Sequence, residues 1–160
     1  MAASRSSRII SVEHVTISST QSFEDVRTKL ETLAPRIDNG IFARVQSGDS
    51  AGALRELEAL PKLTIFSQRD HGKLLSIAGM KRQAIQYEIG NPLTASKMSR
   101  HKLPASLYPP IRVLLREDGD VAFEFDGPAS VFKQFGDEEV DAVAQQLDRD
   151  LKSLLEAAAS

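Results

Sequence analysis

The chain contains no cysteine and no tryptophan among its 160 residues. Without cysteine there can be no disulfide bonds, no thiolate metal sites and no cysteine nucleophile. No apolar run approaches the roughly 18 residues that a membrane-spanning helix needs, so we expect no membrane partner. Residues 1–8 are rich in Ser and Arg and lack the apolar core of a secretory signal, so we predict a flexible tail there. A cytoplasmic location is the default expectation.

Several functional motifs are also missing. The glycine patterns of phosphate loops and dinucleotide-binding turns do not occur, nor does the Gly-x-Ser-x-Gly elbow of serine hydrolases. The histidines at positions 14, 71 and 101 are scattered, and no His or carboxylate cluster has metal-ligand spacing. We therefore predict no metal site and no bound cofactor.

The net charge of −2 conceals an uneven distribution. Residues 61–116 hold 10 Lys and Arg against 2 acidic residues, whereas residues 117–160 hold 12 acidic residues against 3 basic ones. One explanation is that the basic middle of the chain folds against the acidic C-terminal segment. The other is an anion-binding site in the middle region. An acidic domain without an aromatic-rich basic face does not favour nucleic acid as a partner.

Hydrophobic periodicity predicts one domain over residues 1–160. Strands are expected over Arg8–Ile17, Leu63–Gln68 and Ala84–Ile89, followed by a hairpin over residues 111–125. Helices are expected after the capping residues Ser22, Asp49 and Asp137, and residues 39–60 are read as a helical insertion that could act as a lid. This order predicts an α+β fold, a mainly antiparallel sheet of about five strands with helices packed on one face.

The hairpin sequence favours a three-residue loop, Glu117-Asp118-Gly119, with the glycine in a left-handed conformation. That loop would pair Ile111 with Phe125, Val113 with Phe123 and Leu115 with Val121 on one face. The other face would then carry Arg112 opposite Glu124 and Arg116 opposite Asp120, which are favourable pairs of opposite charge. A shift of the register by one residue would turn every side chain to the wrong face.

The span from about Thr64 to Leu155 (residues 64–155) resembles the domain of unknown function 302 family. The resemblance rests on Asp70-His71, Gly90-Asn91-Pro92, Pro110-Ile111-Arg112-Val113 and, with one added residue, Asp126-Gly127-Pro128. It implies an α+β domain that is often a homodimer and has no assigned activity. The chain departs from the family pattern at Ala95-Ser96-Lys97, where the family has a Gly-Thr-Pro-like helix start, and at the more basic Ser99-Arg100-His101-Lys102.

His71 is the candidate catalytic residue, because a histidine oriented by a carboxylate can act as a general base near neutral pH. Asp70 cannot orient it directly, since adjacent strand residues point to opposite faces. Glu88 or Asp126 would have to do so across the sheet. The alternative interpretation is a histidine that bonds the backbone and closes the strand.

Asn91 is the centre of a candidate anion site. It lies between a strand end and a helix start, where free backbone N–H groups favour an anion. Lys97, with Arg100 or His101, would supply counter-charge, and Tyr87 could line the mouth of the pocket. The alternative is an ordinary turn with solvated cations. We expect the Asn91 corner and His71 to open onto the same pocket.

Three functions remain open from the sequence. The first is a domain that binds a small anionic or aromatic metabolite through Tyr87, Glu88, Asn91, Lys97, Arg100, His101 and Asp126. The second is a cofactor-independent isomerase or lyase that uses His71. The third is a structural homodimer.

Overall fold

A five-stranded antiparallel sheet carries the other elements of the molecule. The computed structural model describes residues 2–160, so Met1, the first residue of the predicted tail, lies outside the described residues. The sheet has the order β1-β5-β4-β3-β2, and each neighbouring pair is antiparallel. Its strands are β1 (His14–Ser19), β2 (Thr64–Asp70), β3 (Gln83–Gly90), β4 (Ile111–Glu117) and β5 (Val121–Asp126).

Helices lie in every connection between consecutive strands except the β4–β5 hairpin, and two more α-helices follow β5, which confirms the α+β class. The α-helices are α1 (Phe23–Leu33), α2 (Gly40–Gln46), α3 (Ser50–Glu58), α4 (His71–Ser76), α5 (Pro92–Ser99), α6 (Pro128–Phe132) and α7 (Glu138–Ala159). Two short 3₁₀ helices, η1 (Leu103–Leu107) and η2 (Lys133–Phe135), follow α5 and α6.

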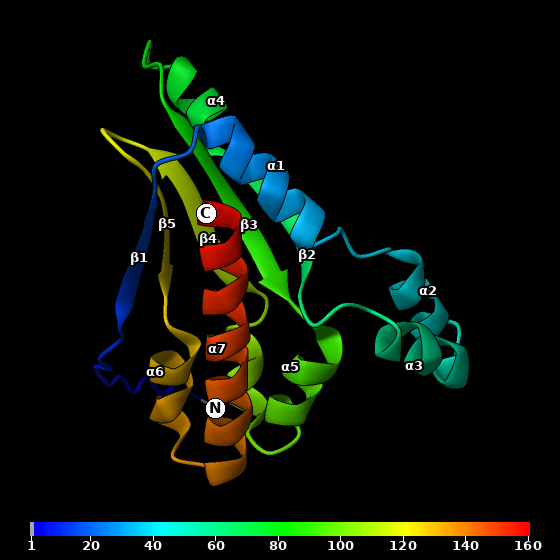
Figure 1. The fold of residues 1–160 in the computed structure, drawn as a ribbon. Coiled ribbons are helices and arrows are strands. Elements are labelled where there is room, and N and C mark those ends of the chain that lie inside the picture. The colour runs from blue at the N-terminus through cyan, green and yellow to red at the C-terminus, as the bar shows by residue number, and fades with distance from the viewer. Residues whose placement is uncertain (1) are drawn as a thin grey trace.

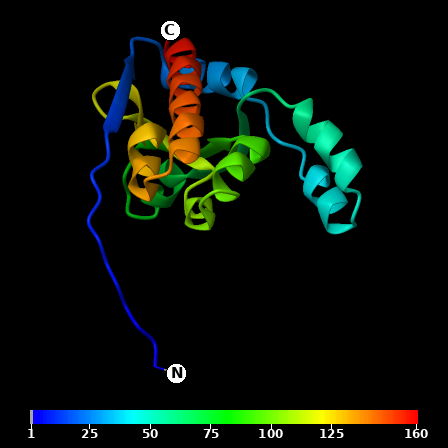
Figure 2. The same cartoon turned by 90° about the horizontal axis from the view of Figure 1, so that it is seen from below.

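One face of the sheet is covered and the other is open. In Figure 1, α1, α5, α6 and α7 lie over the same face, and Figure 2 shows this layer edge-on, with α2 and α3 projecting to one side. Residues 39–60 therefore do contain helices, as predicted. A role for them as a lid stays a prediction.

Alternation along the strands explains the two faces. On β3 the side chains of Ile85, Tyr87 and Ile89 are buried beneath the helices, while Gln86 and Glu88 lie on the open face. The apolar stripe of α7 packs on the same core with Val140, Ala144, Leu147 and Leu151, all of them buried. The apolar side chains that recur every two residues along β3 therefore pack in the same core as those that recur every 3.6 residues along α7, as the sequence pattern predicts.

The three predicted N-caps are confirmed. Ser22 accepts a hydrogen bond from the N–H of Asp25, Asp49 from that of Gly52, and Asp137 from those of Glu139 and Val140. Each cap satisfies backbone donors that a helix start leaves unpaired, which is why these residue types were informative in the sequence.

The first strand begins later than predicted. We expected it over Arg8–Ile17, but β1 begins at His14, which pairs with Asp126. Asp126 is the last residue of β5, and the chain then turns into α6. Residues 8–13 consequently have no neighbouring strand, and β-branched side chains alone do not make one.

The hairpin loop has three residues, but its position in the sequence differs from the prediction. It comprises Asp118–Asp120, with Gly119 at its centre at φ +82°. The register pairs Leu115 with Phe123 and Glu117 with Val121. This is a shift of two residues from the predicted register, so every side chain keeps its predicted face. Arg116 now pairs with both Asp120 and Glu124, and the predicted pair of Arg112 with Glu124 does not form.

No helix within residues 2–160 is both long and apolar enough to cross a membrane. The homodimer and the cytoplasmic location stay predictions.

Helix α4 lies against the start of β3 through a glycine. A β-carbon on Gly72 would stand 2.3 Å from the carbonyl oxygen of Arg82 and 3.3 Å from the amide nitrogen of Ala84. Asp70 caps the same helix by accepting a hydrogen bond from the N–H of Lys73 at 2.9 Å. The close approach therefore needs a residue without a side chain, directly after the Asp70-His71 pair.

We predict that Gly72→Ala destabilises the fold by about 1–3 kcal/mol, because the added carbon must push backbone atoms apart. The matched control is Gly90→Ala, where the nearest atoms to an added carbon lie at 3.6 Å, an ordinary contact. Urea unfolding of both variants measures the difference. Equal midpoints for the two variants would contradict the packing described here.

Candidate functional site

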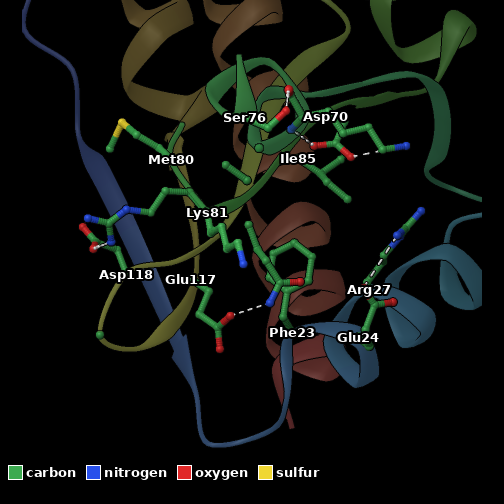
Figure 3. Close-up of a pocket in the computed structure, with 16 residues that line it drawn as sticks. Phe23, Glu24, Arg27, Asp70, Ser76, Met80, Lys81, Ile85, Glu117 and Asp118 are labelled. Atoms are coloured by element: carbon green, nitrogen blue, oxygen red, sulfur yellow. Dashed lines mark hydrogen bonds and ion pairs between the residues drawn. The ribbon is translucent and has the colours of Figure 1, made fainter. Parts of the chain in front are cut away.

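A pocket with a volume of about 750 Å³, which we call the α4 pocket, lies at one end of the sheet. Four segments converge on it (Figure 3): the start of α1, the residues around α4, the start of β3 and the β4–β5 loop. Its lining residues are Phe23, Glu24, Arg27, Asp70, Gly72, Lys73, Ser76, Met80–Ile85 and Glu117–Gly119.

Most charges of the α4 pocket are paired. Arg82 contacts Asp118 at 2.7 Å, Lys73 lies 3.9 Å from Asp70, and Arg27 lies 3.8 Å from Glu24. The carboxylate of Glu117 accepts a hydrogen bond from the amide of Gln83.

The exception is Lys81, whose ammonium group has no carboxylate within 4.0 Å among residues 2–160. Figure 3 shows its side chain extending toward the middle of the pocket, between Met80 and Phe23. Phe23 and Ile85 are buried and provide an apolar floor. The pocket therefore combines one uncompensated positive charge with apolar contact surface.

His71 is the first residue of α4, and its side chain is half-buried. Its neighbours Asp70 and Gly72 line the α4 pocket, but His71 does not. Within the described residues no carboxylate or other group forms a side-chain hydrogen bond with its ring, and the carboxylate of Asp70 is used to cap the helix. Nothing orients His71 as a general base.

Asn91 lies at the other end of the β2–β3 pair. Thr64 faces Gly90 and Asp70 faces Ile85, so His71 and Asn91 are separated by about six residues of strand, or roughly 20 Å. The expectation that both open onto one pocket is wrong. Antiparallel neighbours place the end of one strand beside the start of the other, and these two corners belong to opposite ends.

Asn91 caps α5 as predicted, and that role removes the anion site. Pro92 has no N–H, the N–H groups of Leu93 and Thr94 donate to the side-chain oxygen of Asn91, and the N–H of Ala95 donates to its carbonyl. The Asn91 amide nitrogen itself donates to the carbonyl of Pro61 at 3.2 Å. All first-turn donors are used internally, so the start of α5 has no free N–H group for an anion.

The three predicted cations near α5 do not lie in one site. Lys97 lines two adjoining cavities between α3, α5 and α7, which we call the α5 groove. Arg100 is exposed, and its guanidinium donates only to the carbonyl of Ser96 in its own helix, at 3.4 Å. His101 is exposed at the end of α5. Neither Arg100 nor His101 lines the α4 pocket or the α5 groove.

Tyr87 is a core residue and lines no pocket mouth. Its side chain is fully buried, and its hydroxyl donates to Glu31 at 2.9 Å. Burial and the hydrogen bond to Glu31 raise the pKa of Tyr87. Arg27, in turn, donates to Glu31 at 3.2 Å. This chain of contacts fixes α1 over the sheet and orients Arg27 at the wall of the α4 pocket.

Glu88 and Asp126 lie on β3 and β5, away from the α4 pocket and the α5 groove. Asp126 lines a smaller pocket of about 180 Å³ together with Tyr108 and Arg112. The Ser67 hydroxyl and the Arg69 guanidinium bond Glu88 and hold its pKa below its usual value. Asp126 accepts from His14 at 3.1 Å. Neither carboxylate contacts His71, so neither orients it across the sheet.

Sequence reasoning missed Lys81 and Arg27 as pocket residues. They belong to segments that are distant in the chain, α1 and the connection between α4 and β3, and the fold brings both to the same pocket. The one available signal was the excess of positive charge in residues 61–116, which includes Lys81.

The ring of His14 bridges two carboxylates on β5, with Nδ1 3.1 Å from Asp126 and Nε2 3.0 Å from Glu124. Hydrogen bonds to Asp126 and Glu124 raise the pKa of His14 above its ordinary 6.5. A raised pKa in the folded state means that the stabilisation is fully present below about pH 6.5 and disappears as the pH rises through the folded pKa.

We predict that proton NMR titration of His14 shows a pKa above 6.5, and that Glu124→Gln with Asp126→Asn returns it toward that value. The difference in unfolding free energy between wild type and this double variant should be larger at pH 5.5 than at pH 9. An unchanged His14 titration in the double variant would contradict the bridging geometry.

Comparisons with known proteins agree with the fold. The model of the family described as "Domain of unknown function DUF302" matches residues 51–158, so the match begins within α3, inside the predicted insertion. No curated protein matches the chain. Among solved structures, the chain is similar to an uncharacterized conserved DUF302 protein from Bacillus stearothermophilus, with a TM-score of 0.66 and 14% identity over 91% of this chain and 97% of that chain. This likeness shows the fold alone. Because the family model covers well over half of the sequence, the chain belongs to the DUF302 family.

Proposed function

We propose that this protein binds a small anionic metabolite with an aromatic body in the α4 pocket. The observation that carries the proposal is Lys81, a cation directed into the α4 pocket without a carboxylate partner within residues 2–160. A volume of about 750 Å³ lies within the range typical of small-molecule sites.

The lining matches an amphipathic ligand. Phe23 and Ile85 form the floor, and Met80, which is 43% exposed, adds an adaptable thioether at the side. An aromatic ring on this floor would place its carboxylate near Lys81. The paired charges at Arg82–Asp118 and Lys73–Asp70 would then provide a polar rim around the ligand.

The proposal is binding and not acid–base catalysis, because His71 neither lines the pocket nor has an orienting carboxylate.

Benzoate is a suitable probe, with benzyl alcohol as its uncharged analogue. In ¹H–¹⁵N NMR titrations we expect benzoate to shift the amides of Lys81, Ile85 and Gly119, and benzyl alcohol to bind more weakly. Lys81→Met keeps most of the unbranched side chain and removes its charge. It should weaken benzoate binding about tenfold, because a hydrogen bond to a charged group contributes about 1.5–3 kcal/mol.

Lys97→Met is the matched control, since it removes a lysine from the α5 groove and leaves the α4 pocket unchanged. Native mass spectrometry of freshly purified protein tests the same idea without a chosen probe, and a retained small molecule should be lost in Lys81→Met. The proposal fails if benzoate shifts none of these amides at millimolar concentration, or if both lysine variants bind it equally.

A further inference from the structure

The α5 groove is a second hollow, at the opposite end of the β2–β3 pair from the α4 pocket. It consists of two adjoining cavities of about 280 and 360 Å³ that share five lining residues, namely Lys62, Thr94, Lys97, Gln146 and Asp150. Figure 1 shows α5 alongside α7 with α3 at their side, and contacts join α5 to both helices. The groove and the α4 pocket share no residue.

The inner cavity of about 280 Å³ has an aliphatic floor. Leu63 and Leu147 are 6% and 5% exposed, and Val143 is half-buried between them and the solvent. No aromatic side chain lines either cavity. A floor of branched aliphatic side chains in a narrow groove favours a chain-like apolar body over a ring.

The charged residues that line the inner cavity leave an excess of positive charge. Lys62 lies 3.3 Å from Asp150, and Asp150 also accepts a hydrogen bond from the amide of Gln146 at 3.0 Å. Lys97 has no carboxylate within 4.0 Å among residues 2–160, so the two lysines face one carboxylate. Glu58 lines only the outer cavity.

One neutral donor stands beside Lys97. Thr94 lines both cavities, and its hydroxyl forms no side-chain hydrogen bond within the described part of the chain. Its backbone N–H donates to the side-chain oxygen of Asn91. Lys97 is one turn further along α5, so the two groups lie on the same side of the helix. Together they can hold a carboxylate head group.

We propose that the α5 groove binds an aliphatic carboxylate. Lys97 and Thr94 hold its head group, and its alkyl chain lies on Leu63, Val143 and Leu147. Because the start of α5 has no free N–H group, the charge of Lys97 is the main attraction for the anion. This site goes beyond the proposed function and does not depend on it.

Octanoate tests the site, with octanol as the uncharged analogue. We expect octanoate to shift the amides of Leu63, Thr94 and Leu147 in ¹H–¹⁵N spectra, and octanol to bind more weakly. Lys97→Met should weaken octanoate binding about tenfold, which corresponds to the loss of one charge-assisted hydrogen bond. Lys97 is exposed, so the variant should fold, and its spectrum away from the groove should be unchanged.

Two further variants test whether octanoate binds in the α5 groove. Lys81→Met, in the α4 pocket, should leave octanoate binding unchanged, and Val143→Asp should abolish it by placing a negative charge on the floor. The proposal is overturned if the groove amides do not respond to octanoate, or if Lys97→Met binds as wild type. It is overturned as well if octanoate binding depends on Lys81, whereas failure of the benzoate experiment alone leaves this site untouched.

Discussion

The antiparallel pairing of β2 with β3 determines where the candidate binding sites lie in this fold. It places Thr64 beside Gly90 at one end of the sheet and Asp70 beside Ile85 at the other. Both chain segments that leave these strands become helices, α4 at one end and α5 at the other. Each helix borders a hollow, and the hollows share no residue. Any account of function must therefore treat the two ends as separate places.

Several residues with the chemistry of a binding site are used to hold the fold together. Asn91 satisfies the first turn of α5, Tyr87 joins the core to Glu31, and Asp70 caps α4. Buried donors and acceptors must find partners, because an unpaired one costs about 1–3 kcal/mol. The polar residues at the ends of these strands are therefore bonded to the protein itself. Only polar groups without such a bond remain available to a ligand.

Local signals in the sequence predicted local structure well. Ser22, Asp49 and Asp137 were identified as caps because capping involves residues only two or three positions apart. The buried faces of β3 and α7 followed from periodicity. The start of β1 could not be predicted in the same way, because it depends on where β5 ends. The predicted hairpin register differs from the observed one by two residues, although the bond that closes the loop, from the N–H of Asp118 to the carbonyl of Asp120, is local.

The candidate site was harder to predict, because it depends on contacts between distant segments. Lys81 becomes a candidate binding residue only because Phe23, from the distant helix α1, lines the same pocket. Lys97 was identified as a cation near α5, and Asn91 does line the outer cavity of the groove with it, but the Asn91 side chain is already bonded to Leu93 and Pro61. Residue type alone could not distinguish the residues that line a pocket from those that hold the fold together.

The uneven charge of the chain has two causes that operate together. Part of the basic middle does pair with the acidic C-terminal segment, through Lys62 with Asp150, Arg82 with Asp118, and Arg116 with Asp120. Lys81 and Lys97 have no such partner among residues 2–160, and a solvated lysine by itself indicates no site.

These two lysines have similar surroundings. Each stands beside buried apolar side chains, Phe23 and Ile85 in one case and Leu63 and Leu147 in the other. An amphipathic anion needs both features, because apolar contact supplies most of the affinity and an uncompensated charge orients the molecule. Of the ten basic residues in 61–116, the two proposed anion sites depend on Lys81 and Lys97 alone.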